Sequence, residues 1–253
     1  LPTLVPYAQL PGPTDQEQPG LPLGLSELDL RPVYLDPSAE PFLLIFGDVE
    51  SGKTAALRVL ARAIADRYPP DQARIIVVDY RRGLLGSVSG QHLLAYGSNA
   101  SVTEGIMRDV VAAMRERLPG PDVTPEQLRD RSWWRGPDLY LLVDDYDLVS
   151  GAGTNPLAPL VEFAAQARDI GLHIVVTRRT GGAARALYDP LIGRMRELAA
   201  AGIVMSGSKE EGVLLGNIRP QPLPPGRGWL VTRRDGSRLV QLAWLAPDAG
   251  TAD

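Results

Sequence analysis

The 253-residue sequence has no cysteine and only two histidines, His92 and His173. A disulfide scaffold and a thiol nucleophile are therefore excluded, and a zinc site is nearly excluded. No run approaches the roughly 18 consecutive apolar residues that a membrane-spanning helix requires. A chain of this length can bury an adequate core as a single α/β domain without such additions.

Lysine is also rare. Lys53 and Lys209 are the only two lysines, and arginine supplies the remaining positive charge. The formal net charge is −4. Sequence-independent nucleic-acid binding depends on neutralising phosphates with basic side chains, so we expect no nucleic-acid partner. The chain begins at Leu1 and has no signal-peptide pattern. We interpret it as part of a longer polypeptide, from a cytoplasmic region.

Apolar segments of strand length alternate with amphipathic helical segments through the middle of the chain. The predicted strands are residues 42–46, 75–78, 139–143 and 173–177, and the predicted helices include residues 53–68, 101–118 and 157–164. Ser101 and Glu104 form a capping-box pattern for the second helix. Strands that are apolar throughout and alternate with helices are typical of a parallel sheet covered by helices on both faces.

The two ends of the chain differ from this pattern. Residues 1–40 are a Pro/Gly-rich lead-in with a short strand region, and residues 41–246 form the predicted α/β domain. Near the C-terminus, Asp235-Gly236 lies between two strand patterns, which predicts a β-hairpin. Residues 247–253 are small and polar, and we expect a disordered tail.

The segment between the first core strand and its helix reads Gly47-Asp48-Val49-Glu50-Ser51-Gly52-Lys53-Thr54, which fits G-x-x-x-x-G-K-[ST] at every fixed position. In this phosphate loop, glycines let the backbone curl so that N–H groups face phosphate oxygens, and the following helix adds its positive end. Lys53 would neutralise the β- and γ-phosphates, and the Thr54 hydroxyl would bind Mg²⁺. The sequence therefore predicts a Mg²⁺–nucleotide site.

Two aspartates follow the predicted strand at residues 139–143. Asp144 is placed as a Walker B aspartate, which holds Mg²⁺ through water. Motor ATPases of this general kind usually place a glutamate next, to polarise the attacking water, whereas this chain has Asp145. A base that falls about an ångström short loses on the order of a hundredfold in rate. A backbone shift that restores the reach of Asp145 is the alternative.

These motifs resemble those of FtsK/SpoIIIE-type ATPases, and more narrowly those of the tandem ATPase modules of EccC, the membrane-anchored ATPases of type VII secretion. The segments that carry the resemblance are residues 21–25, 47–54, 143–149 and 171–179. The resemblance implies a RecA-like P-loop NTPase fold that binds Mg-ATP. It also implies that adjacent modules or neighbouring subunits complete the ATP sites.

In this family, the first module is usually the competent hydrolase, later modules bind ATP firmly, and the last receives the C-terminal signal of WXG-type substrates. The active pattern Thr-Gln-Arg is Thr177-Arg178-Arg179 in this chain. Arg178 thus replaces a glutamine that senses the γ-phosphate, as Asp145 replaces a glutamate. The resemblance implies a late module with weak or no hydrolysis that serves assembly and signal recognition. The alternative is an active motor that translocates protein or, less favoured, DNA.

Three arginines are candidates for contacting a neighbouring module, although a solvated surface role is favoured for each: Arg168, Arg194 and Arg196. The tryptophans at 133 and 134 are expected to pack over a helix end, with a partner contact as the alternative. Trp229, Trp244 and His173 are expected in the core.

Overall fold

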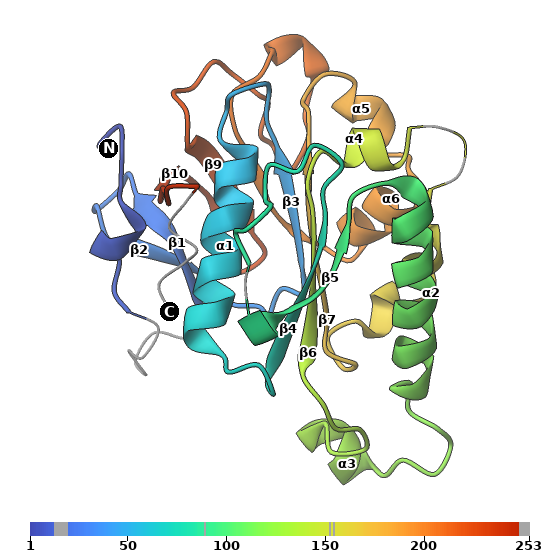
Figure 1. Cartoon of the computed structure of the whole chain (residues 1–253). Coiled ribbons are helices and arrows are strands. Elements are labelled where there is room, and N and C mark those ends of the chain that lie inside the picture. Colours follow the sequence, from blue (N-terminus) through green and yellow to red (C-terminus); the bar gives the residue numbers. More distant parts are fainter. Residues whose placement is uncertain (13–19, 89, 152, 154, 248–253) are drawn as a thin grey trace.

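A single mixed sheet organises the computed structural model, which describes residues 1–12, 20–88, 90–151, 153 and 155–247. Its ten strands follow the order β2-β1-β10-β9-β8-β3-β7-β6-β4-β5 (Figure 1). They are β1 (Leu21–Ser26), β2 (Pro32–Leu35), β3 (Phe42–Phe46), β4 (Ala73–Val78), β5 (Leu93–Gly97), β6 (Asp138–Val143), β7 (Leu172–Arg178), β8 (Ala201–Val204), β9 (Arg227–Thr232) and β10 (Gly236–Leu242).

Six adjacent strands, from β8 to β5 in that order, are parallel, and the four strands beyond β8 pair antiparallel. The four core strands predicted from apolar runs are confirmed within two residues at their ends. Strands β1, β5 and β8 escaped prediction. β1 contains Pro22 and Gly24, and β8 has only four residues, so neither shows an apolar run of typical strand length.

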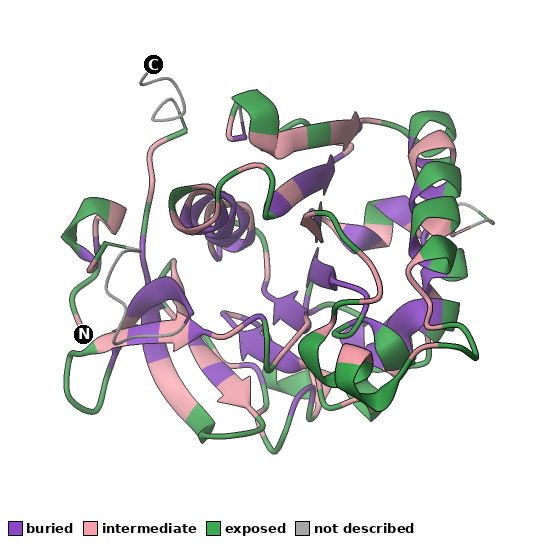
Figure 2. Cartoon of the chain, turned by 90° about the horizontal axis from the view of Figure 1, so that it is seen from below, coloured by how far each residue is buried: buried purple, intermediate pink, exposed green. Residues whose placement is uncertain are grey.

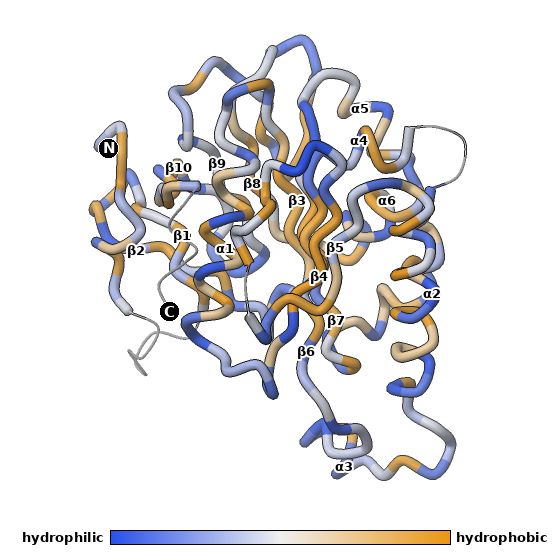
Figure 3. Tube along the Cα trace, viewed as in Figure 1, coloured by the Kyte–Doolittle hydropathy of each residue, from blue (hydrophilic) through white to orange (hydrophobic). Residues whose placement is uncertain are grey.

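Helices cover both faces of the parallel strands, as predicted (Figure 1). Alternate side chains of β3 point to opposite faces, since Leu43 and Ile45 pack with helix α1 (Lys53–Arg67) in one core cluster. Phe42, Leu44 and Phe46 belong to the other cluster, which contains the second set of helices: α2 (Ala100–Glu116), the 3₁₀ helix η3 (Ala158–Gln166) and α6 (Pro190–Glu197). Burial concentrates on the inner sides of these helices (Figure 2), and hydrophobic residues concentrate in the central strands (Figure 3).

The remaining helical elements are short: α3 (Pro125–Asp130), α4 (Tyr146–Val149), α5 (Ala183–Ala186), and 3₁₀ turns at Tyr7–Gln9, Gly90–His92 and Lys209–Glu211. None of the helices in the described ranges combines the length and hydrophobicity needed to cross a bilayer.

Both ends of the chain meet at the antiparallel side of the sheet. β1 and β2, which precede residue 40, join this sheet through the pairing of β1 with β10. The predicted hairpin is confirmed, with Thr232 opposite Gly236 and a positive φ of 71° at the glycine. Trp244 lies beyond β10, pairs with the N-terminal segment and is 43% exposed, so its predicted core position is wrong. Trp229 is only half-buried, and residues 248–253 of the predicted tail lie outside the described residues.

Asn99, rather than Ser101, caps helix α2. Its Oδ1 accepts a hydrogen bond from the backbone N–H of Val102 at 3.0 Å. The capping-box prediction for Ser101 and Glu104 is therefore wrong, because the helix begins at Ala100 and Ser101 already lies in its first turn. Asparagine is as effective a cap as serine, so the pattern alone did not separate the two residues.

We predict that N99A lowers the free energy of unfolding by about 1 kcal/mol, since the backbone N–H of Val102 in the first turn loses its side-chain acceptor. The matched control S101A removes a hydroxyl two residues away and should change stability by less than about 0.5 kcal/mol. Urea unfolding followed by circular dichroism measures both. An equal loss in the two variants would contradict the assigned cap.

Candidate nucleotide-binding site

The loop of residues 47–54 connects the C-terminal end of β3 to the start of α1. Its first residues are fixed by the two strands that flank β3. The N–H of Gly47 donates to the carbonyl of Arg178 at 3.0 Å, and that of Asp48 donates to the carbonyl of Ser206 at 2.8 Å. The parallel sheet therefore holds the loop where the carboxyl ends of its central strands meet, which is the usual ligand-binding edge of such sheets.

The backbone of this loop leaves several N–H groups available. Among the hydrogen bonds of the described residues, no protein acceptor occurs for the N–H groups of Val49, Glu50, Gly52, Lys53 and Thr54. Gly52 has a φ of 106°, and a Cβ there would lie 3.0 Å from the backbone nitrogen of Gly226. Glycine is thus required at this position. Free N–H groups at a helix N-terminus form a favourable site for phosphate.

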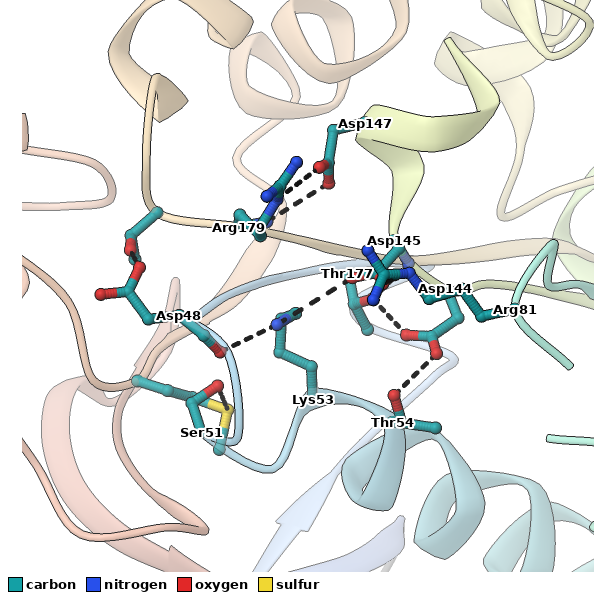
Figure 4. A network of polar contacts seen from close by, with 12 residues as sticks. Asp48, Ser51, Lys53, Thr54, Arg81, Asp144, Asp145, Asp147, Thr177 and Arg179 are labelled. Carbon is teal, nitrogen blue, oxygen red and sulfur yellow. Dashed lines mark hydrogen bonds and ion pairs between the residues drawn. The ribbon is translucent and has the colours of Figure 1, made fainter. Parts of the chain in front are cut away.

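Lys53 is 7% exposed and folds over the loop. Its Nζ donates to the carbonyl oxygen of Asp48 at 3.0 Å and lies 4.0 Å from Oδ1 of Asp145 (Figure 4). The ammonium group therefore lies at the loop together with the free N–H groups. This arrangement is suited to neutralising a polyphosphate.

The two predicted magnesium ligands are in direct contact. The Thr54 hydroxyl donates to Oδ2 of Asp144 at 2.7 Å, and the Thr177 hydroxyl donates to Oδ1 at 2.6 Å (Figure 4). Asp144 is 3% exposed; burial raises the pKa of its carboxyl, and the two hydroxyl hydrogen bonds oppose that rise. A hydroxyl and a carboxylate are hard oxygen donors of the kind that Mg²⁺ prefers.

The described part of the chain contains no cluster of three or more His, Cys, Asp or Glu side chains that could hold a metal ion. Mg²⁺ does not require such a cluster, since it is usually bound through one or two protein oxygens together with substrate phosphates and waters. The pair formed by Thr54 and Asp144 therefore fits an ion that arrives with a nucleotide.

Asp145 lies beside this pair, at the start of α4. Its backbone N–H donates to the Thr177 hydroxyl at 2.9 Å, and its φ is 46°. Its carboxylate forms an ion pair with Arg81, with Nε 3.0 Å from Oδ2. The sequence did not reveal the roles of Thr177 and Arg81. The sequence offered one signal for Thr177, namely a polar residue near the end of an apolar strand. That strand, β7, lies next to β6, which precedes Asp144.

Arg178 reaches the site through its main chain, whose carbonyl anchors Gly47. Its side chain is half-buried, and Nη1 has no hydrogen-bond partner among the described residues. Burial lowers the pKa of Arg178, and the charges of Asp147 and Asp189 oppose that effect. Asp147 instead pairs with Arg179, with Nε 2.8 Å from Oδ2. A catalytic role for Arg178, which stands where the family has a γ-phosphate-sensing glutamine, stays a prediction, as does that of Asp145.

A model of the FtsK/SpoIIIE family matches residues 7–123. The chain is 50% identical over 244 residues to the ESX secretion system protein EccC of Thermomonospora curvata, covering 96% of this chain and 18% of that protein. The chain belongs to the FtsK/SpoIIIE-type ATPases. The module therefore spans about a fifth of the length of this curated relative.

Two solved structures show the same relationship for this FtsK/SpoIIIE-type module. The cytoplasmic domain of the T. curvata type VII secretion ATPase EccC has a TM-score of 0.94 at 49% identity, covering 97% of this chain and 28% of that one. T. curvata EccC (ATPases 2 and 3) in complex with a signal sequence peptide gives the same TM-score and identity, covering 97% and 44%. The RecA-like P-loop fold and the resemblance to EccC ATPase modules are confirmed.

The other residues singled out in the sequence lie away from the phosphate loop of this EccC-type module. Trp133 packs over the C-terminal end of α2, as predicted, because its Nε1 donates to the carbonyl of Arg117 at 2.8 Å. His173 is 4% exposed in the core, and its Nε2 lies 2.9 Å from Oδ2 of Asp138. The three candidate arginines are surface residues at different positions: Arg168 and Arg196 are exposed, and Arg194 pairs with Glu197.

We predict that K53A reduces the affinity for Mg-ATP by at least a hundredfold, because the ammonium group would contribute charge-assisted hydrogen bonds to the β- and γ-phosphates, worth about 3 kcal/mol in total. Titration with a fluorescent ATP analogue measures the change. The only other lysine provides the control, since K209A alters an exposed residue and should bind normally. Normal binding by K53A would contradict the site.

Proposed function

We propose that this chain is an ATP-binding module of a type VII secretion ATPase that binds Mg-ATP and hydrolyses it slowly or not at all. The proposal rests on a contrast within the nucleotide site between the residues for binding and the residues for hydrolysis. The residues for binding are complete, with a free phosphate loop, a buried Lys53 and a contact of 2.7 Å between Thr54 and Asp144. The two positions that serve hydrolysis in the family carry Asp145 and Arg178 instead of glutamate and glutamine.

The position of Asp145 supports slow hydrolysis. A general base must reach the attacking water within hydrogen-bond distance. The side chain of Asp145 is one methylene shorter than glutamate, and its backbone N–H is already fixed by the Thr177 hydroxyl. This contact limits the backbone shift that would lengthen its reach. Nucleotide binding would then stabilise the module and its assembly without rapid turnover.

The proposed partners are adjacent ATPase modules of the same chain or of neighbouring subunits. The T. curvata relative is much longer than this chain, and one matching structure contains ATPases 2 and 3 together. The matching EccC structure is a cytoplasmic domain, which supports a cytoplasmic position in a membrane-anchored parent protein. A translocase motor is the second candidate, and measured turnover separates it from the first.

A cavity on the module is a candidate site for a secretion signal. It has a volume of about 580 Å³ and lies between α6, the segment before β8 and strand β9. Apolar side chains and charged side chains of both signs line it: Leu187, Leu214, Val231, Arg196, Arg233 and Glu197, with Tyr188. A cavity with both apolar side chains and arginines suits one turn of an amphipathic helix that carries a carboxylate. The solved structure of T. curvata EccC (ATPases 2 and 3) in complex with a signal sequence peptide supports the proposal that a WXG-type substrate tail binds here.

We predict that D145E increases single-turnover ATP hydrolysis, by up to about a hundredfold, because the added methylene restores the reach of the base. D147E is the matched control, since Asp147 pairs with Arg179 outside the magnesium pair, and it should leave the rate unchanged within about twofold. Turnover by the wild-type module at ordinary enzyme rates of about 10 s⁻¹ would contradict slow hydrolysis and favour the motor.

We predict that Y188A weakens binding of a WXG-type C-terminal peptide at least about tenfold, because Tyr188 is 88% exposed at the cavity edge and aromatic anchors dominate such contacts. Fluorescence anisotropy with the labelled peptide measures the effect. L28A is the control, because Leu28 is also 88% exposed but lies between β1 and β2 and does not line the cavity. Wild-type affinity in Y188A would place the peptide elsewhere, and failure of all such peptides to bind would remove the recognition role.

A further inference from the structure

We propose that Arg81 is a positioning residue that holds the carboxylate of Asp145 and thereby suppresses ATP hydrolysis. The proposal rests on the proposed function, because it concerns the same nucleotide site. It adds a device that restrains the base in this chain, beyond the length of the aspartate side chain. Three features of the structure support it: the hydrogen-bonded turn that carries Arg81, the ion pair with Asp145, and a second cation near the other oxygen of the carboxylate.

The loop that carries Arg81 is fixed by a buried aspartate. Asp79 follows β4 and is 1% exposed. Its Oδ1 accepts the N–H of Arg81 at 3.0 Å, and its Oδ2 accepts the N–H of Leu84 at 2.7 Å and the Tyr96 hydroxyl at 2.8 Å. Three hydrogen bonds to Asp79 thus hold this turn, two from its own backbone and one from Tyr96 on β5, so the start of the Arg81 side chain has a defined position.

The sheet places this loop next to the catalytic aspartates. β4 and β6 are adjacent parallel strands, and Val78 pairs with Val143 at their carboxyl ends. The residues that follow each strand therefore meet at the same edge of the sheet. Arg81 lies three residues beyond Val78, and Asp145 lies two residues beyond Val143, which is close enough for their side chains to join.

The Asp145 carboxylate lies between two cations. Its Oδ2 is 3.0 Å from Nε of Arg81, and its Oδ1 is 4.0 Å from Nζ of Lys53 (Figure 4). The Asp145 side chain is only 14% exposed, whereas that of Arg81 is 58% exposed. The ion pair is therefore partly shielded from solvent on the side of the carboxylate, which reduces screening of the attraction between the two charges.

This contact affects the chemistry that a water-activating carboxylate has to perform. A carboxylate oxygen in an ion pair with a guanidinium is drawn toward that cation, which makes the oxygen less available to a water molecule. General-base catalysis requires a lone pair aimed at the attacking water. Arg81 keeps Oδ2 engaged, and the Thr177 hydroxyl fixes the backbone of the same residue. Arg81 thus holds the side chain of Asp145 and Thr177 holds its backbone, and both contacts restrain hydrolysis.

The test compares single-turnover hydrolysis and Mg-ATP affinity in the 253-residue protein and its variants. R81A keeps the backbone N–H that Asp79 accepts, so the loop is preserved. We expect R81A to raise the hydrolysis rate about tenfold while affinity changes by less than about threefold. R81K should restore the slow rate by pairing with Asp145. R82A, which removes the exposed neighbouring arginine, should match the wild type.

The double variant R81A/D145N separates positioning from a structural effect. We expect the gain to vanish when the carboxylate becomes an amide, because the released base is Asp145 itself. An unchanged or lower rate in R81A, or a gain that persists in the double variant, overturns the proposal. Should R81A melt at a lower temperature than the wild type, R81Q replaces it in the same comparison. Rapid wild-type hydrolysis would contradict the proposed function, and the R81A and R81A/D145N rates would still decide the role of Arg81.

Discussion

The site depends on the contacts of the Asp144 carboxylate at the carboxyl end of β6. One of its oxygens accepts the Thr54 hydroxyl and the other accepts the Thr177 hydroxyl. These two bonds join the phosphate loop, the central strand β6 and the neighbouring strand β7 at one buried point. A buried carboxylate without partners would be costly, so the two threonines stabilise the position that a magnesium ligand must occupy.

The parallel sheet makes this junction possible. The carboxyl ends of β3, β4, β6 and β7 lie at one edge, and each ends in residues that serve the site. β3 continues into the phosphate loop, β4 into the turn of Arg81, β6 into Asp144 and Asp145, and β7 into the arginine whose carbonyl anchors Gly47. The same arrangement explains why binding and hydrolysis can diverge. The loop and Asp144 would hold the nucleotide, whereas Asp145 contacts Arg81 through its carboxylate and Thr177 through its backbone N–H.

The sequence predicts those parts of the fold and of the site that short, contiguous segments of the chain encode. The apolar run of β3, the phosphate loop and the amphipathic face of α1 follow one another within 30 residues; the strand and the helix are confirmed, and the loop connects them. Asp144 was predictable for the same reason, since it ends an apolar strand. The contact between Thr54 and Asp144 joins residues 90 positions apart, but both belong to known motifs.

Other features depend on tertiary structure that local pattern does not encode. The ion pair of Arg81 with Asp145 arises from the adjacency of β4 and β6, which no spacing along the chain specifies. Ser101 fits the pattern of a helix cap, but α2 begins at Ala100, so Asn99 occupies the cap position. Trp244 resembles a core residue in a strand pattern, yet it lies past the end of β10. In each case a neighbouring element, rather than the residue itself, decides the outcome.

The most direct test of the central claim is to extract and identify the nucleotide that stays bound when the protein is isolated with Mg²⁺ and incubated. We expect close to one nucleotide per chain, recovered as ATP after about an hour at 25 °C, because the binding residues are complete and the base is restrained. Recovery of ADP, or of no nucleotide, would contradict it.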